Sequence, residues 1–473
     1  MRDEGKRNAG RGEDSVRRLR LRVRLPKDSI RVGALARVPK DAVDMDQVLA
    51  DLKVRNGAYW AMVKAGVPTE GVEPFIELFR VDGDYVYVPR HYKLPLLRGL
   101  DKYDVRPQPP VVDAPSHQIK LRDDVQREAS ETLSSTTRDK IISLACGKGK
   151  SVIALHAAAE GERFPLLIVV NTRALLRQWK KEIAKFYGIS VEDVGHVQGA
   201  RLDWEGRSVA VGMLHTVIRH WKFTGTDFYK YWRTIAFDEC HRLGSEQFSH
   251  ACTLFPGERW GLSATVERAD KNEKVFKLHL GRVSYENLDQ PLKPKVYFID
   301  TGITVDEAKF IWRGRFKLAQ LTTWLSNHKA RNAMLLDWIH RMARKGRTIL
   351  VLGERVAALY DLCDACEVES KAVHVGSMDD EERAEALTKQ VVFATQHLAK
   401  EGLNRPEFDT LINIIPFGGK GRLRQTIGRI LRELDGKKPP KVLVFVDQIG
   451  ICQALANKMR NACFDLEYDV YES

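Results

Sequence analysis

The length and charge of the chain indicate a multidomain protein with a polyanionic partner. It has 473 residues, of which 44% are hydrophobic and 29% charged, a composition that excludes fibrous and intrinsically disordered classes. At about 150 residues per domain, this length predicts roughly three domains. Lysine and arginine total 76 against 63 acidic residues, and the resulting net charge of +13 favours nucleic acid as the partner.

No apolar run in the sequence is long enough to cross a membrane. The longest runs, such as residues 166–170, have the length of a strand, whereas a membrane span needs about 18 residues. The arginine-rich N-terminus has no apolar segment typical of a secretory signal, and the seven cysteines are thinly scattered. We therefore expect a cytoplasmic protein with no membrane partner.

Residues 1–115 are expected to form a small α+β accessory domain. The first 25 residues carry nine lysines or arginines against four acidic residues, which is typical either of a solvated terminus or of an arm that contacts phosphates. Two β-like runs, 76–81 and 85–89, flank a turn sequence at 82–84 and predict a hairpin. Four prolines in residues 107–115 indicate a linker.

Short apolar strands alternate with helices after this linker, a pattern that predicts parallel sheets with helices on both faces. A proline-containing break at 292–295 divides the alternation into two units, which we place at 116–292 and 293–473. The predicted strands are 141–145, 166–170, 209–213, 234–237 and 260–263 in the first unit, and 348–352, 372–375, 391–395, 411–415 and 442–447 in the second.

A segment rich in glycine and lysine, residues 146–151, lies between the first of these strands and a predicted helix. Its glycines allow backbone N–H groups to converge on phosphate oxygens at a helix N-terminus. Lys150 would then reach the β- and γ-phosphates of a nucleotide, and the Ser151 hydroxyl would bind Mg²⁺. The complete signature has glycine where Leu144 stands, but the strand–loop–helix context still predicts a phosphate-binding loop.

Two adjacent carboxylates, Asp238 and Glu239, follow the predicted strand 234–237. Ligands of parallel sheets bind at the carboxyl ends of the strands, which is where this pair lies. Asp238 would belong to the Mg²⁺ site, and Glu239 would orient and deprotonate an attacking water molecule.

Two further polar clusters could complete such a site. Residues 261–265, with Arg268 and Asp270 shortly after, could hydrogen-bond the carboxylates or the second unit. In the second unit, Arg429 and Arg432 are three residues apart in a predicted helix and are expected to share one helix face. A guanidinium suits the charge that develops in phosphoryl transfer, although an ordinary basic surface helix is the alternative.

The order of these segments over residues 116–473 resembles the superfamily 2 helicases. Within them, the chain is similar to the group that contains bacteriophage UvsW-type helicases, XPB-type helicases and the helicase subunits of restriction enzymes. The resemblance implies two tandem RecA-like parallel-sheet domains, with ATP and Mg²⁺ bound between them and nucleic acid bound across both. Cys240 replaces the usual small third residue of the Asp-Glu motif, and Asn404 stands where Asp is common.

The resemblance also implies a role for each matching residue. Catalysis is expected from Glu239, Lys150, Arg429, Arg432 and Gln425, and metal binding from Ser151 and Asp238. The residues expected to bind the nucleotide are Arg122, Gln126, Gly147, Lys148, Gly149, Lys150 and Ser151. Those expected to contact nucleic acid are Thr172, Arg173, His215, Thr216, Arg355 and Thr395.

The expected function is that of an ATP-dependent DNA helicase or translocase that acts on branched or duplex DNA in replication, recombination or repair. The accessory domain 1–115 is expected to bind this DNA ahead of the motor, and a packing or solubilising extension is the alternative. An RNA helicase and the motor subunit of a restriction system are the alternative enzymes. A nucleotide-dependent clamp that does not hydrolyse ATP is disfavoured by the presence of Lys150, Glu239 and both arginines. If a bacteriophage encodes the chain, it would act in the host cytoplasm.

Two other patterns have a structural and a functional interpretation. Cys363 and Cys366 have the spacing of metal ligands, but they lie one turn apart in a predicted helix and favour a partly buried helix face. Aromatic residues between 221 and 232 could stack on bases, and core packing is the alternative that we favour.

Overall fold

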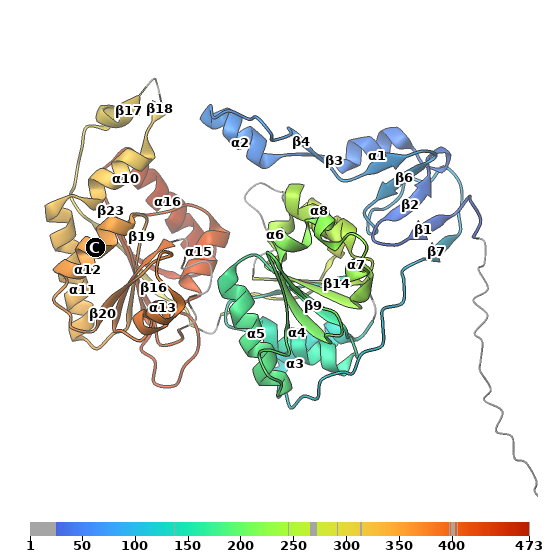
Figure 1. Cartoon of the computed structure of the whole chain (residues 1–473). Coiled ribbons are helices and arrows are strands. Elements are labelled where there is room, and N and C mark those ends of the chain that lie inside the picture. The colour runs from blue at the N-terminus through green and yellow to red at the C-terminus, as the bar shows by residue number, and fades with distance from the viewer. Residues whose placement is uncertain are drawn as a thin grey trace, which may run out of the picture.

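Three β-sheets organise the chain. The computed structural model describes residues 25–472 apart from 137, 245, 265–271, 291, 313–314, 397, 399–402 and 404 (Figure 1). A five-stranded sheet lies in the N-terminal region, an eight-stranded sheet follows, and a seven-stranded sheet completes the chain. The basic arm predicted at the N-terminus falls almost wholly within residues 1–24 and so lies outside the described residues.

The N-terminal sheet has the strand order β5-β6-β2-β1-β7. The predicted hairpin is confirmed, because β5 and β6 pair antiparallel around Gly83. The prediction of one continuous strand at 76–81 is wrong, because β4 pairs with β3 in a separate ribbon and the buried Leu78 lies outside either strand, between β4 and β5. The elements are β1 (Ile30–Val32), β2 (Ala36–Pro39), α1 (Met45–Leu52), β3 (Lys53–Arg55), α2 (Gly57–Ala65), β4 (Phe75–Glu77), β5 (Arg80–Asp82), β6 (Tyr85–Val88) and β7 (Lys102–Asp104).

The eight-stranded sheet has the order β11-β10-β12-β9-β13-β14-β8-β15, and only β11 runs antiparallel to its neighbour. Its central strands are continuous apolar runs because helices bury both faces. All five predicted strands are present, whereas β10, β11 and β15 were not foreseen. The strands are β8 (Lys140–Leu144), β9 (Leu166–Val170), β10 (Gly195–Gln198), β11 (Arg201–Asp203), β12 (Val209–Met213), β13 (Thr234–Asp238), β14 (Glu258–Ser263) and β15 (Val283–Asn287). The helices are α3 (Asp124–Ser134), α4 (Lys150–Glu160), α5 (Arg173–Tyr187), α6 (Leu214–Val217), α7 (Phe228–Tyr231), α8 (Glu246–Leu254) and α9 (Glu273–Leu280).

The seven-stranded sheet is wholly parallel, in the order β20-β21-β19-β22-β23-β16-β24. The five predicted strands are again present, and β16 and β24 were not foreseen. The strands are β16 (Lys295–Asp300), β19 (Ile349–Gly353), β20 (Lys371–His374), β21 (Val391–Thr395), β22 (Thr410–Asn413), β23 (Lys441–Val446) and β24 (Asp469–Glu472), and a small ribbon joins β17 (Ile311–Trp312) to β18 (Arg315–Phe316). The helices are α10 (Leu318–Ser326), α11 (Lys329–Arg344), α12 (Val356–Ala365), α13 (Asp380–Ala386), α15 (Lys420–Ile427) and α16 (Gly450–Phe464).

The predicted fold class is confirmed, since two parallel-sheet α/β units follow a small α+β domain. Each parallel sheet has two hydrophobic clusters, one on either face, formed by alternating strand residues and the covering helices. In Figure 1 the N-terminal domain (blue) lies beside the first α/β unit (green), and the second unit (yellow to red) lies on the opposite side of the first.

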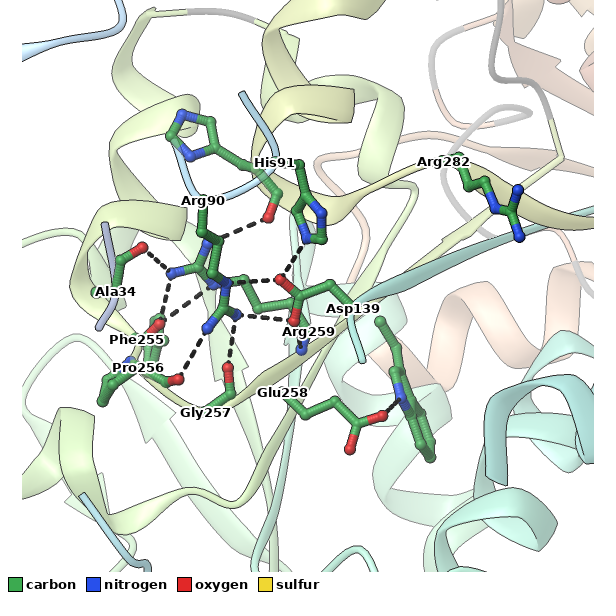
Figure 2. A network of polar contacts seen from close by, with 12 residues as sticks. Ala34, Arg90, His91, Asp139, Phe255, Pro256, Gly257, Glu258, Arg259 and Arg282 are labelled. Carbon is green, nitrogen blue, oxygen red and sulfur yellow. Dashed lines mark hydrogen bonds and ion pairs between the residues drawn. The ribbon is translucent and has the colours of Figure 1, made fainter. Parts of the chain in front are cut away.

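A buried polar network joins the N-terminal domain to the first α/β unit (Figure 2). Arg90 Nη2 donates to Asp139 Oδ1 at 2.8 Å, and His91 Nε2 lies 2.8 Å from Asp139 Oδ2. Arg90 also donates to the carbonyls of Pro256 and Gly257, at 2.9 and 2.7 Å. Burial alone would raise the pKa of Asp139, but Arg90 and His91 lower it to about 2. The carboxylate is therefore charged, and its partners hold the two domains together.

Candidate ATP site and nucleic-acid face

The loop between β8 and α4 has the backbone of a phosphate-binding loop. Gly147 and Gly149 have φ values of 87° and 81°, a left-handed region that glycine adopts without a steric cost. The N–H of Lys148 donates to the Ala145 carbonyl at 3.3 Å, and α4 begins at Lys150. The N-terminal N–H groups of α4 are thereby available for an anion next to the Lys150 side chain.

Gln126 connects the segment ahead of α3 to this loop. It is only 5% exposed, its Oε1 accepts from the Arg122 N–H at 2.8 Å, and its Nε2 donates to the Lys148 carbonyl at 3.0 Å. A Cβ atom on Gly149 would lie 2.5 Å from Gln126 Nε2, so the glycine is also needed for this close approach. The structure thus brings together four of the predicted nucleotide-binding residues, Arg122, Gln126, Lys148 and Gly149. Among them, Gln126 supports the loop.

The two predicted carboxylates lie at the end of β13. Asp238 Oδ2 accepts a hydrogen bond from Trp179 Nε1 on α5 at 2.9 Å, and Asp238 Oδ1 accepts from the Glu239 N–H at 3.0 Å. No role was expected for Trp179 from the sequence. The signal that could have found its role is the indole N–H, which needs a partner when it is buried.

The pKa values of the two carboxyl groups are shifted in opposite directions. Burial, and then the Glu239 charge, raise the pKa of Asp238 to about 6. Burial would also raise the pKa of Glu239, but the charges of Lys150 and His241 outweigh it and hold that pKa below its usual value. Glu239 is therefore ionised at neutral pH, as a group that orients or deprotonates water must be.

A hydrogen bond links the carboxylate segment to the strand after it. His241 Nδ1 lies 3.0 Å from the Ser263 hydroxyl on β14 and 3.3 Å from Glu239 Oε2. The prediction that hydroxyls of the 261–265 segment bond the carboxylate site thus has a contact at Ser263. Thr265, Arg268 and Asp270, which belong to the same prediction, lie outside the described residues.

The arginines of the second unit face the first unit across the phosphate loop. A Cβ atom on Gly147 would lie 3.2 Å from Arg432 Cγ, and one on Gly428 would lie 2.9 Å from Cys146 Cβ. Arg429 is close enough to Glu239 for its charge to lower the pKa of that carboxyl. Burial and the neighbouring Arg429 lower the pKa of Arg432 to about 10, so the Arg432 guanidinium remains charged at neutral pH.

The prediction that Arg429 and Arg432 share one helix face is wrong. Helix α15 ends at Ile427, Arg429 lies in the turn that follows it, and Arg432 lies in the irregular segment after that turn. The close contact between Gly428 and Cys146 explains why glycine stands directly after the helix, because a side chain there would collide with the phosphate loop. Gln425 does lie on α15 and is half-buried.

The donors present at this edge of the sheet suit Mg²⁺. Asp238 supplies carboxylate oxygens, and Ser151 supplies a hydroxyl in the first turn of α4. The buried Glu239 Oε2 accepts no hydrogen bond from the described residues, and its ion-pair partner His241 Nδ1 lies 3.3 Å away. The described residues contain no cluster of three or more side chains that could hold a metal alone, and Mg²⁺ commonly uses one or two carboxylates together with substrate phosphates.

The residues predicted to contact nucleic acid divide into two kinds. Arg173 and His215 are exposed at the starts of α5 and α6. Thr172 instead caps α5 by accepting from the Leu175 N–H at 3.2 Å, and the buried Thr216 accepts from the Gly199 N–H at 3.0 Å.

In the second unit, Arg355 Nη2 donates to the Ala319 carbonyl at 2.7 Å, and Thr395 lies at the end of β21. Arg355 and Thr395 are half-buried. Asn404, the departure from the usual motif, lies outside the described residues.

The cysteine pair at 363 and 366 and the aromatic residues between 221 and 232 each had a structural and a functional interpretation. Cys363 and Cys366 are buried in the core of the second unit, the first on α12 and the second just after it. Most of the aromatic cluster, including Phe223, Phe228 and Trp232, is buried in the core of the first unit, whereas Trp221 is 63% exposed.

Comparisons with known proteins agree with this geometry. Residues 115–268 match the family described as type III restriction enzyme, res subunit. A protein of Acanthamoeba polyphaga mimivirus named as an ATP-dependent RNA helicase is 24% identical over 89% of this chain and 80% of its own length. A DNA 3'-5' helicase XPB of Kineococcus radiotolerans is 24% identical over 68% of this chain and 60% of its own length.

A solved structure, S. cerevisiae Dbp5 bound to RNA and ADP BeF3, superposes with a TM-score of 0.55 at 15% identity, over 74% of this chain and 89% of the other. At that identity the likeness concerns the fold, and it confirms the two RecA-like domains. The chain is a superfamily 2 helicase. Within that superfamily it is of the XPB and restriction-subunit type, and it is an ATP-dependent enzyme. Among its described helices, none has both the length and the apolar character that crossing a membrane requires.

Proposed function

We propose that this helicase is a DNA translocase that acts on branched or duplex DNA in replication, recombination or repair. The observation that carries the proposal is the composite site, in which Arg429 and Arg432 of the second unit face Glu239 and the phosphate loop of the first. A site divided between two units ties their relative position to the bound nucleotide. The relatives named as XPB helicases support DNA as the substrate.

Each residue of the site has a proposed role in ATP hydrolysis. Lys150 would bind the β- and γ-phosphates together with the N-terminal N–H groups of α4. Glu239 would accept the proton of the attacking water, which its ionised state permits. Arg429 and Arg432 would stabilise the negative charge that grows on the phosphoryl oxygens.

Asp238 and Ser151 are the residues that would hold Mg²⁺, which when bound would neutralise charge on the phosphates. Loss of the γ-phosphate removes a link shared by the two units, so the cleft between them would open. Nucleic acid bound across both units, at Arg173 and His215 on the first and Arg355 on the second, would then be moved along. Binding through the backbone would be independent of sequence and sensitive to salt.

The test is the rate of ATP hydrolysis with forked DNA, duplex DNA, single-stranded DNA and RNA at equal nucleotide concentration. We expect DNA to stimulate hydrolysis, with forked or duplex DNA at least as effective as single strands. Stimulation by RNA alone would contradict the proposal and favour the RNA helicase function, which is the function in the name of the mimivirus relative.

The match to the restriction-enzyme family favours a second candidate, the motor subunit of a restriction system. Such a motor would need a separate nuclease chain. Two results together would identify that function: duplex DNA stimulates ATP hydrolysis, and a lysate of the host cells cleaves DNA at specific sites only when this chain is present. Hydrolysis that responds to forks with no dependence on a recognition sequence would contradict it.

A further inference from the structure

A row of three arginines crosses the N-terminal sheet on the face opposite its core. Arg31 on β1 pairs in register with Arg37 on β2, Arg37 pairs with Tyr87 on β6, and Tyr87 pairs with Arg80 on β5. The strand residues on either side of Arg37, Ala36 and Val38, are buried in the core. We call Arg31, Arg37 and Arg80 the arginine row.

The arginine row has no acidic partner. Within the described part of the chain, none of the three forms an ion pair with a carboxylate, unlike Arg98 and Arg106 of the same domain, which pair with Asp28 and Asp104. Like charges directly opposite each other destabilise a pair of strands. A sheet that keeps two arginines opposite each other without a carboxylate therefore bears a cost that binding an anion would remove.

Aromatic rings hold two of these guanidinium groups in place. Arg37 Cζ lies 4.0 Å from the centre of the Tyr85 ring, and Arg80 Cζ lies 4.6 Å from that of Tyr87. These stacks orient the guanidinium groups before any ligand binds, at little further cost in side-chain entropy. The Nε and Nη2 atoms of Arg37 and the Nε of Arg31 are buried without a hydrogen-bond partner in the described structure. Arg31 Nη2 donates to the carbonyls of Leu25 and Pro26, at 3.0 and 3.2 Å.

The arginine row lines a groove between two domains. The groove has a volume of about 450 Å³, and its opposite wall comes from His250, Thr253 and Leu254 on α8 of the first RecA-like domain. The buried network around Arg90 and Asp139 fixes the N-terminal domain against this unit, and Arg259 adds a 2.6 Å bond to the Ala34 carbonyl beside the groove (Figure 2). The position of the arginine row relative to the motor is thus set by buried contacts.

We propose that the arginine row binds backbone phosphates of the DNA on which the motor acts. Three strand spacings make the row about 14 Å long, and one strand of a duplex carries a phosphate about every 3.4 Å of axis. Guanidinium groups bind phosphate oxygens in a bidentate manner and carry no sequence preference in doing so. This inference rests on the proposed function, because it takes DNA as the substrate.

The test compares three full-length variants by measuring the affinity for forked DNA across a salt series, without nucleotide. The first variant is Arg31→Gln/Arg37→Gln/Arg80→Gln. The second replaces the same arginines with lysine and keeps their charge. The third, Arg98→Gln/Arg341→Gln/Arg460→Gln, removes three arginines that are paired with carboxylates elsewhere.

The glutamine variant of the row should bind forked DNA more weakly. The slope of log K against log salt should fall by about 2.7, or about 0.9 for each phosphate that is no longer neutralised. The lysine variant should keep most of the slope, and the variant of paired arginines should keep the slope of the unmodified protein. Thermal melting of each variant checks that the N-terminal domain is folded.

A folded glutamine variant with an unchanged slope overturns the inference, and so does an equal reduction of the slope in the variant of paired arginines. If the row instead binds an acidic protein segment, the DNA slope is unchanged, and the inference is likewise wrong. The proposed function fails by a separate measurement, the absence of DNA-stimulated ATP hydrolysis in the unmodified protein. The two failures are therefore distinguishable.

Discussion

Glu239 has a backbone conformation that few residues other than glycine adopt. Its φ is 52°, in the left-handed region, which costs of the order of 1 kcal/mol or more and persists only where surrounding contacts impose it. The preceding Asp238 is held by Trp179, and the following Cys240 is fully buried against the core. The conformation aims the Glu239 side chain toward Lys150 and His241, and both charges lower its pKa.

The first prediction separates nucleotide binding from hydrolysis. Glu239→Gln should bind ATP and fail to hydrolyse it, because the change removes a base but no phosphate ligand. Lys150→Ala should lose both, because it removes a positive charge from the phosphates. Titration with a fluorescent ATP analogue and a phosphate-release assay measure the two properties. Glu160→Gln, at the far end of α4, is the matched control and should behave as the unmodified protein.

Near-normal turnover by either folded variant, Glu239→Gln or Lys150→Ala, would contradict its catalytic role.

The second prediction concerns Arg429, which acts from the other unit. Arg429→Ala should fold and bind ATP, but its hydrolysis should be slower by on the order of 10³-fold, because a charge that stabilises the transition state is removed. Steady-state kinetics with saturating DNA give kcat and KM separately. The control is Arg341→Ala, an exposed arginine paired with Asp337 on α11. A raised KM with unchanged kcat would make Arg429 a binding residue.

At the scale of elements, the phosphate loop is supported by helix α3, whose Gln126 was expected from the sequence to bind the nucleotide. Asp123 caps α3 by accepting from the Gln126 N–H at 2.9 Å, and the Gln126 side chain reaches the Lys148 carbonyl. The start of α3 therefore sets the shape of the loop before α4. Gly149 stands at the contact, because any Cβ there would displace Gln126.

The third prediction tests this support with two glycines of similar φ. Gly149→Ala introduces a left-handed alanine and also a clash with Gln126, whereas Gly206→Ala introduces left-handed strain at φ 73° with no atom within 4 Å. Both should lower the free energy of unfolding by about 1 kcal/mol. Only Gly149→Ala should weaken ATP binding, by tenfold or more if the distortion costs about 1.4 kcal/mol at the phosphates. Equal ATP affinities in the two variants would contradict the role of Gln126.

At the scale of the whole molecule, the N-terminal domain is joined to the motor by a buried charge network and by apolar contacts from Val275 on α9. Removing residues 1–115 would strip Asp139 of Arg90 and uncover Val275. Such a truncation would alter stability as well as DNA binding. Substitutions on the surface of the domain, such as those in the arginine row, are therefore the cleaner test of its contact with DNA.

The fourth prediction measures the contribution of the network to stability. Asp139→Asn should lower the free energy of unfolding by about 3 to 5 kcal/mol, because it leaves Arg90 and Arg259 buried without their counter-charge. Asp104→Asn, a half-exposed carboxylate paired with Arg106, is the control and should cost about 1 kcal/mol or less. Urea unfolding followed by tryptophan fluorescence provides both values.

The same carboxylate predicts a dependence of stability on pH. The pKa of Asp139 is about 2 in the folded protein, below the roughly 3.9 of an unfolded aspartate. Its contribution to stability is therefore complete above about pH 4 and is lost as the pH falls toward 2. Unfolding measured through that range should depend less on pH in Asp139→Asn. An unchanged profile would mean that other carboxylates control acid unfolding.

Patterns that depend on neighbouring residues could be predicted from the sequence. Most of the ten strands foreseen in the two α/β units are buried on both faces, which leaves an apolar run that is visible without the fold. The edge strand β20 is only partly buried. The phosphate loop and the carboxylate pair each follow such a strand, so their side chains could be placed at one edge of the sheet. Strands with mixed polarity, such as β10 and β15 near the sheet edges, had no comparable signal.

Features that depend on distant residues came only from packing. Helix α15 ends before Arg429, and Gly428 meets Cys146, more than 280 residues earlier in the chain. No local propensity predicts that contact. The bond from Trp179 to Asp238 and the joining of Arg90 to Asp139 likewise unite segments far apart in sequence. Short-range periodicity reports which face of an element is buried, but the partner that buries it is set by the free energy of the whole fold.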